Sequence, residues 1–338
     1  MLSKPGKNPL LVVAVLVALG VLVPFMGPFV ILLVTQALIF GILAMSVDLL
    51  LGYTGLATMG QAAFLGIGAY TTAILATRFG FGLGCDYGWA ILLGMLAGAL
   101  VAAVFGLFAV RATGVYFLII TLALGMCVWG LAIRWNAVTG GDNGINLLSR
   151  PVCGVALSKD INFFYLALGL MSATMGALWV LVRSPFGRSL LGIRESETRM
   201  KMLGYNTWLH KYIAYILSGA CGGMAGVLWA HLHGIVAPET VILTTSVDAL
   251  LMVVLGGPGT LVGGPIGTAV VVFLREFLST KVTWWQYVLG GVYVMTILFL
   301  PDGLMGIPAR LRQRRSKGGN GAGGAGRAEK PAALASRV

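Results

Sequence analysis

The chain has 338 residues, of which 58% are hydrophobic and only 10% are charged. Soluble domains carry about 25% charged residues, so this composition excludes an ordinary water-soluble domain. Apolar runs of about 20 residues recur along the chain, and each is long enough to cross a bilayer as a helix. These runs are continuous rather than alternating, which excludes a membrane β-barrel. The composition predicts an all-α polytopic membrane protein.

The formal net charge is +12 at pH 7. The basic residues lie in segments that flank the apolar runs, which is the pattern of the positive-inside rule. We therefore interpret this charge as a determinant of membrane topology that also contacts lipid headgroups. It does not predict binding to nucleic acid.

We predict about ten transmembrane helices, within a range of eight to ten. They lie at roughly residues 10–25, 29–51, 60–77, 89–110, 115–134, 162–182, 211–232, 241–256, 264–279 and 285–300. Six of these spans precede the basic segment 183–211 and four follow it. Both counts are even, so the N-terminus, this segment and the C-terminus are all predicted to be cytoplasmic.

The same reading divides the chain into three parts. Residues 1–9 form a short cytoplasmic N-terminus, and residues 10–308 form the transmembrane domain. Residues 309–338 are basic and rich in Gly and Ala, which is typical of a disordered cytoplasmic tail.

Four cysteines are present, and their spacing predicts no metal site. Cys85 and Cys153 fall in two loops on the side opposite the basic segment. Either they form a disulfide or both are unpaired, because the sequence does not fix the distance between their Cα atoms.

Two glycine clusters share the pattern LGxxGxxxxG, at residues 51–60 and 255–264. A Ser-Val-Asp triplet precedes each cluster, at 46–48 and at 246–248. Helices broken at matching positions of an internal repeat are typical of transporters and point to the translocation site. Because the chain has 49 glycines, a chance match is the alternative. The short spans beside the second cluster are predicted to be broken or re-entrant helices.

Asp48 and Asp248 are the acidic residues predicted to lie within the apolar zone. An acid at membrane depth is costly unless it faces protein or water. These two acids either line a permeation path or accept hydrogen bonds from the N–H groups of the glycine turn that follows each of them. Their positions near helix ends favour the second interpretation.

The segment 183–211 is a basic interruption between two apolar runs. Ser184 and Pro185 predict a helix start, with Ser as the N-cap and Pro at the first helical position. We expect Gly192 to interrupt this helix and Gly204 to end a second short helix. The segment is predicted to dock a cytoplasmic partner, and a loop that faces lipid headgroups is the alternative.

Several ordered motifs between residues 25 and 308 resemble one family. SPFGRSL, IRESE and LGY in the basic segment are similar to the ATPase-coupling loop of branched-chain amino acid ABC-transporter permeases, in the LivM-like branch. GYTG with GQAAFLGIGAY resembles the first glycine signature of that family, and VLGGPGT resembles the second. TGGDNGI resembles its outer-loop motif and PDGL its C-terminal ending. The tail beyond about residue 310 has no such match.

The resemblance implies roles for individual residues. The implied coupling-loop residues are Gly187, Arg188, Arg194, Glu195, Glu197 and Gly204. Together with the two glycine clusters and their acids, the resemblance gives as candidate residues of the translocation path Asp48, Gly52, Thr54, Gly55, Gln61, Asp248, Gly256 and Gly257. The implied outer-loop residues are Thr139, Gly140, Gly141, Asp142, Asn143 and Gly144. The segment 124–127 departs from relatives that carry Glu or Gln there, which leaves the solute open.

The chain contains no G-x-x-x-x-G-K-[ST] phosphate loop, so ATP and Mg are expected on partner subunits and no cofactor on this chain. The resemblance implies a non-enzymatic permease subunit in a bacterial inner membrane. Its implied partners are a second homologous permease, two ABC ATPase subunits and a periplasmic solute-binding protein. The solute is a branched-chain amino acid or, alternatively, urea, an amide or an aromatic acid. A secondary transporter is less favoured, because two acids near helix ends are few for ion coupling.

Overall fold

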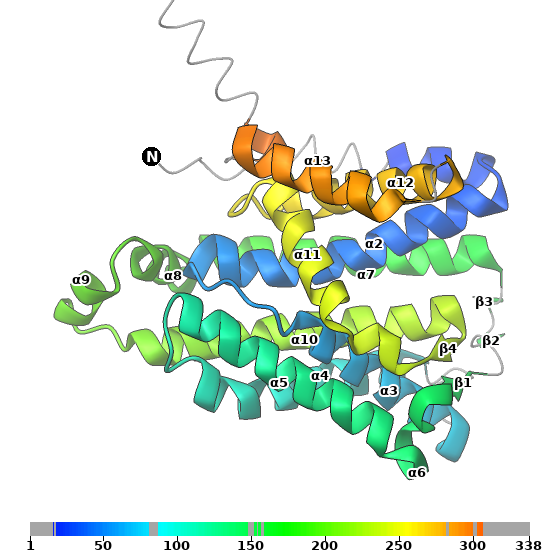
Figure 1. The fold of residues 1–338 in the computed structure, drawn as a ribbon, viewed down its shortest axis with the longest axis horizontal. Coiled ribbons are helices and arrows are strands. Elements are labelled where there is room, and N and C mark those ends of the chain that lie inside the picture. The colour runs from blue at the N-terminus through cyan, green and yellow to red at the C-terminus, as the bar shows by residue number, and fades with distance from the viewer. Residues whose placement is uncertain are drawn as a thin grey trace, which may run out of the picture.

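The computed structural model describes residues 16, 18–80, 87–147, 152–153, 155–156, 159–281, 284–299 and 303–306. Within these residues the protein is a bundle of long helices (Figure 1). The helices α8 and α9 project from one end of the bundle, and the short strands lie at the other end (Figure 1). For brevity we name these the α8 end and the strand end.

The long helices follow the predicted order of apolar runs. Their bounds are α2 (Pro28–Asp48), α3 (Gln61–Phe79), α4 (Tyr87–Ala109), α5 (Val115–Arg134), α7 (Asp160–Arg183), α10 (Thr207–His233), α11 (Leu243–Gly256), α12 (Gly263–Lys281) and α13 (Trp285–Phe299). The first predicted span, 10–25, lies largely outside the described residues, as do the segments 1–9 and 309–338.

Six helices of the described chain are long and apolar enough to cross a membrane. They are Pro28–Thr54, Gln61–Phe79, Gly88–Ala109, Val115–Arg134, Asp160–Arg183 and Thr207–His233. The all-α polytopic class is therefore confirmed, while ten crossings and the sides of the termini stay predictions. The helix α11 is shorter, at 14 residues, and a turn at 257–262 separates it from α12.

The helix α2 forms the centre of the bundle. Its residues from Leu33 to Asp48 are almost all buried, and the neighbouring helices α7, α10, α11 and α12 pack around it. A helix that is hydrophobic on every side is stable only when protein or lipid covers every side. Here protein covers it, which holds the end of α2 in a fixed position.

Glycines bring α3, α4 and α10 into close contact. A Cβ atom added at Gly68 would overlap the backbone of Gly223, and one added at Gly98 would overlap the backbone of Gly219. Small residues allow such approach between helices in lipid, where apolar burial gives little net association. The glycine pattern on these helices therefore specifies their packing.

The basic segment folds as two short helices, α8 (Pro185–Glu195) and α9 (Glu197–Met202). Ser184 caps α8 by accepting a hydrogen bond from the Gly187 amide, as the sequence predicts. The prediction that Gly192 interrupts the helix is wrong. Instead α8 continues to Glu195, and Ser196 breaks it by adopting an extended backbone and capping α9. Gly192 lies against Met200, so its missing side chain gives α9 room to fold back.

The strand end is tied together by backbone pairing. Strand β1 (Ile145–Asn146) pairs antiparallel with β4 (Ile235–Val236), which follows α10, and β2 (Val152–Cys153) pairs with β3 (Val155–Ala156). Remaining short elements are η1 (Val23–Phe25), η2 (Leu49–Thr54), α6 (Asn136–Thr139), η3 (Gly141–Asn143), η4 (Pro238–Val241) and η5 (Leu304–Gly306). Cys85 lies outside the described residues, so the disulfide stays untested.

A Gly223→Ala substitution tests the glycine contact between α4 and α10. The added methyl group overlaps the backbone of Gly94, so we expect a loss of about 1–3 kcal/mol in stability. Gly176→Ala on α7 is the matched control, because a Cβ there has open space. Thermal unfolding in detergent should show a lower Tm for Gly223→Ala than for Gly176→Ala. Equal values would contradict close packing at Gly223.

Candidate functional site

The two glycine clusters meet in space. The first begins in the π-helical segment η2, which continues α2 and ends before Gly55, a residue with a φ of +76°. The second forms the 257–262 turn. A Cβ atom at Gly52 would overlap both Asp48 and the Gly259 backbone, with the Gly259 Cα only 2.7 Å away. Glycine at position 52 therefore lets the two turns touch, although 207 residues separate them in sequence.

Asp48 joins these turns. Its Oδ1 accepts a hydrogen bond from the Gly259 amide at 2.6 Å, and its Oδ2 accepts one from the Leu261 amide at 2.9 Å. Asp48 is fully buried. A buried carboxylate needs such partners, and charge-assisted bonds of this length are strong. The favoured hydrogen-bonding role of Asp48 is therefore present, but its partner is the second glycine turn and not the turn that follows it.

Arg194 connects this seam to α8. Its guanidinium donates a hydrogen bond to the carbonyl of Gly52. A Cβ at Gly55 would come within 3.1 Å of the Arg194 Cγ, and one at Gly259 would come within 3.2 Å of its Nη1. One side chain of α8 therefore contacts both glycine turns. We name Asp48, Gly52, Gly259 and Arg194 the turn seam.

Asp248 does not repeat the geometry of Asp48. Its Oδ2 lies 3.7 Å from Nη1 of Arg275 on α12, and its side chain is 30% exposed. Among the described residues it makes no hydrogen bond to the first glycine turn, so the repeat in sequence does not give equivalent contacts here. The sequence reasoning missed Arg275, although a lone arginine in an apolar run is a signal that could have found it.

Gln61 lies in a buried polar network among three helices. Its Nε2 donates to the Ser218 hydroxyl at 2.7 Å, and that hydroxyl donates to the Ser46 carbonyl at 2.8 Å. The Ser46 hydroxyl lies 3.5 Å from the Gln61 Oε1. These groups are fully buried and satisfy one another, which links α2, α3 and α10. The path role expected for Gln61 stays a prediction.

The other residues expected to line the translocation path lie near the two glycine turns. Thr54 donates to the Leu50 carbonyl at 2.6 Å and is buried. A Cβ at Gly256 would overlap the Gly263 backbone, and one at Gly303 would overlap Gly257. Gly303, in the PDGL ending, therefore packs against the second turn.

The residues expected in the coupling loop all lie at the α8 end, but they do not form a single surface. Gly187 is buried against the Val182 backbone, which lets the chain turn sharply between α7 and α8. Arg188, Glu195 and Gly204 are exposed, and Gly204 has a φ of +85°. Among the residues expected in the coupling loop, only Arg194 contacts the two glycine turns.

Glu197 has a structural role that the sequence did not predict. Its Oε2 lies 2.5 Å from the Nζ of Lys211, and its Oε1 lies 3.0 Å from the Nζ of Lys201. Thr207 also donates to its Oε1, at 3.2 Å. Lys211 is only 4% exposed, so Glu197 neutralises a buried charge at the start of α10. This contact fixes α9 to a membrane helix.

The loop 139–144 lies at the strand end. Thr139 donates to the Ala132 carbonyl at 2.7 Å, and Gly140, Gly141 and Gly144 have positive φ values. This geometry leads the chain directly into β1. Asp142 and Asn143 are exposed at the tip of the loop. Of the predicted outer-loop set, these two are the side chains most available to a partner.

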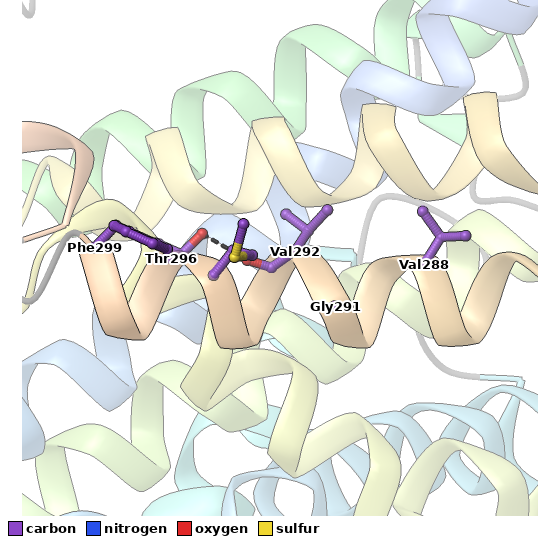
Figure 2. A pocket seen from close by; sticks show the side chains of 6 residues that line it. Val288, Gly291, Val292, Thr296 and Phe299 are labelled. Carbon is purple, nitrogen blue, oxygen red and sulfur yellow. Dashed lines mark hydrogen bonds between the residues drawn. The ribbon is translucent and has the colours of Figure 1, made fainter.

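A shallow groove runs along α13, lined by Val288, Gly291, Val292, Met295, Thr296 and Phe299 (Figure 2). Thr296 donates to its own helix, to the Val292 carbonyl at 2.8 Å. The lining offers almost no polar surface, which fits contact with lipid or an apolar partner and not recognition of a polar solute.

Comparison with known proteins places the chain in a family. Residues 29–299 match the family described as "Branched-chain amino acid transport system / permease component". The chain belongs to this permease family. No solved structure matches the chain.

Curated relatives of this permease carry consistent names. The "High-affinity branched-chain amino acid transport system permease protein LivM" of Salmonella typhimurium is 31% identical, over 86% of this chain and 72% of its own length. The protein of the same name from Escherichia coli K12 is 31% identical, over 88% and 75%. The "Autoinducer 2 import system permease protein LsrC" of Salmonella paratyphi B is 26% identical, over 56% and 55%.

An Asp48→Ala substitution tests the seam. It leaves the buried Gly259 and Leu261 amides without their acceptor, at a cost of about 1–3 kcal/mol each. Thermal unfolding of the purified permease should show a clear drop in Tm. The exposed Asp142→Ala is the matched control and should unfold like the unaltered protein. An Asp48→Ala protein as stable as this control would refute the assigned hydrogen bonds.

Glu197 predicts a pH dependence of stability. Burial alone raises its pKa, but hydrogen bonds and positive charge from Lys211 and Lys201 outweigh this effect, so the net pKa lies below its ordinary value of 4.5. A lowered folded-state pKa stabilises the fold above the unfolded-state pKa, and this is lost as pH falls through the folded value. The Tm difference between the unaltered protein and Glu197→Gln should therefore be largest near pH 7 and shrink below about pH 4.5. A difference independent of pH would argue against the ion pairs.

Proposed function

We propose that the protein is the permease subunit of an ATP-binding-cassette importer for branched-chain amino acids. The observation that carries this proposal is the contact of Arg194 on α8 with the glycine turns at the ends of α2 and α11. A short helix outside the bundle that touches broken helices inside it can transmit movement, because packed elements shift as units.

In this proposal the α8 end faces the cytoplasm, where the exposed residues of α8 and α9 dock a separate ATPase subunit. Two ATPases, a second homologous permease and a periplasmic solute-binding protein complete the importer in a bacterial inner membrane. The loop tip at Asp142 and Asn143 then faces the binding protein. The closing movement of the ATPase pair pushes α8, and Arg194 passes that displacement to the turn seam.

The proposed solute class rests on the relatives. The two named for branched-chain amino acid transport match nearly the whole chain at 31% identity, whereas the autoinducer 2 permease matches about half of it at 26%. The longer and closer match favours branched-chain amino acids over autoinducer 2.

The test uses proteoliposomes that contain the permease with its partner subunits, and measures ATP-dependent uptake of L-leucine. We expect uptake that requires ATP inside and binding protein outside. Uptake driven by an ion gradient without ATPase subunits would overturn the proposal, because a self-sufficient secondary transporter needs no nucleotide.

Arg194→Met tests the coupling path in the same assay. We expect about tenfold lower leucine uptake with ATP hydrolysis still present, because a charge-assisted bond to the first turn is lost. Arg111→Met is the matched control, an exposed arginine in the turn between α4 and α5. Equal uptake by the two variants would show that Arg194 does not couple α8 to the seam.

A further inference from the structure

The pair Asp248–Arg275 lies apart from the turn seam. Asp248 is five residues after the start of α11, and Arg275 is six residues before the last residue of α12. At about 1.5 Å per residue these positions are about 7–9 Å from those helix ends. The turn seam touches the opposite ends of α11 and α12. The pair is therefore near the strand end, where α11 follows β4 and η4.

Arg275 does not point toward the outer surface of α12. The exposed apolar side chains of this helix, Ile266, Val270, Phe273 and Phe277, recur at helical spacing and form one stripe. Arg275 is nine residues beyond Ile266, which at about 100° per residue places it on the opposite face. That face carries the buried residues Thr268, Val271 and Val272.

Arg275 is nevertheless 45% exposed. Its exposed part therefore opens into the space between α12 and its neighbours, and not onto the apolar stripe. An ionised group in an apolar zone is stable only when it faces water or protein. The two charged side chains are therefore partly exposed where α11 and α12 face each other.

The helix α13 lies beside α11 and α12 (Figure 1). On α13 the partly exposed Trp285 and the buried Leu289 and Tyr293 recur every four positions. The Arg275 guanidinium lies 5.2 Å from the centre of the Trp285 ring, within reach of a cation–π contact. The Tyr293 hydroxyl is buried and has no hydrogen-bond partner among the described residues.

The geometry of the pair is loose compared with the other ion contacts of the protein. Asp48 and Glu197 lie 2.5 to 3.2 Å from their partners, whereas Asp248 and Arg275 are 3.7 Å apart. Charge-assisted hydrogen bonds are typically about 2.7–2.9 Å long, so this pair leaves donors and acceptors unused. A guanidinium has five N–H donors in a fork that fits a carboxylate.

We propose that Asp248 and Arg275 form a contact site for the two charged groups of a zwitterionic α-amino acid. Arg275 binds the carboxylate, and Asp248 accepts hydrogen bonds from the ammonium group. The zwitterion is neutral overall and supplies one opposite charge to each member of the pair, so binding leaves neither charge unpaired. This assignment rests on the proposed function, since it places the site where solute arrives in an importer.

The experiment uses the complete importer in proteoliposomes with L-leucine as the probe. Asp248→Asn and Arg275→Met should each lower leucine uptake by about tenfold, because each loses a charged hydrogen bond to the solute. Binding-protein-stimulated ATP hydrolysis should stay within about twofold, because the turn seam is intact. Glu276→Gln is the matched control, a neighbouring acid outside the pair, and should transport like the unaltered protein.

The charge-swapped double variant Asp248→Arg with Arg275→Asp distinguishes the contact site from a purely structural ion pair. If the pair were only structural, the swapped pair would restore leucine uptake. We expect uptake to stay low, because the rest of the path fixes the orientation of the solute. Recovery in the swapped variant, or single variants equal to Glu276→Gln, would overturn the contact site. If the unaltered importer hydrolyses ATP but takes up no leucine, the solute assigned under the proposed function has failed instead.

A second measurement needs no substitution and so does not depend on folding of a variant. Radiolabelled L-leucine is bound to the purified permease complex without binding protein and is competed with analogues. Unlabelled leucine should displace it, while leucinamide, which lacks the carboxylate, and 4-methylpentanoate, which lacks the ammonium group, should be at least about tenfold weaker. Equal displacement by the analogues, or no leucine binding, would overturn the proposal.

Discussion

The arrangement of the helices depends on two hydrogen bonds, which the amides of Gly259 and Leu261 donate to the carboxylate of Asp48. They join the end of the central helix α2 to the break between α11 and α12. Backbone amides at a helix break must find acceptors, and in a membrane protein water is not always available to supply them. A fully buried carboxylate supplies both acceptors here, and Gly52 leaves the space in which the second turn approaches.

The basic segment is attached to this junction. Arg194 contacts the first turn at Gly52, where α2 meets the break between α11 and α12. On the other side of the segment, Glu197 neutralises the buried Lys211 and fixes α9 to α10. The short helices are thus attached to the bundle at two points, by a hydrogen bond from Arg194 and by the ion pair of Glu197, which suits the proposed transmission of movement between subunits.

Polar groups in the described bundle fall into two kinds. Those of Asp48, Gln61 and Ser218 are buried, short-range and satisfied, and they specify how helices pack. The pair Asp248–Arg275 is half-exposed and loosely held, and Tyr293 beside it has an unused hydroxyl. The first kind makes the α8 end rigid, and the second leaves charged groups partly exposed near the strand end. The proposed importer would use both, because it would bind its solute near one end and be driven from the other.

The sequence by itself determined the all-α membrane class, the places of the long helices after residue 28, the cap at Ser184 and the family, since these depend on local composition, periodicity and short motifs. It did not determine that α8 continues through Gly192, because the packing of Met200 on that glycine stabilises the helix from outside. The sequence also singled out Asp48 and Asp248 as acids in the apolar zone, but it did not show which residues they contact. Only the tertiary structure decided that Asp48 binds a turn more than 200 residues away and that Asp248 meets Arg275, because such contacts depend on how distant helices pack and not on local sequence.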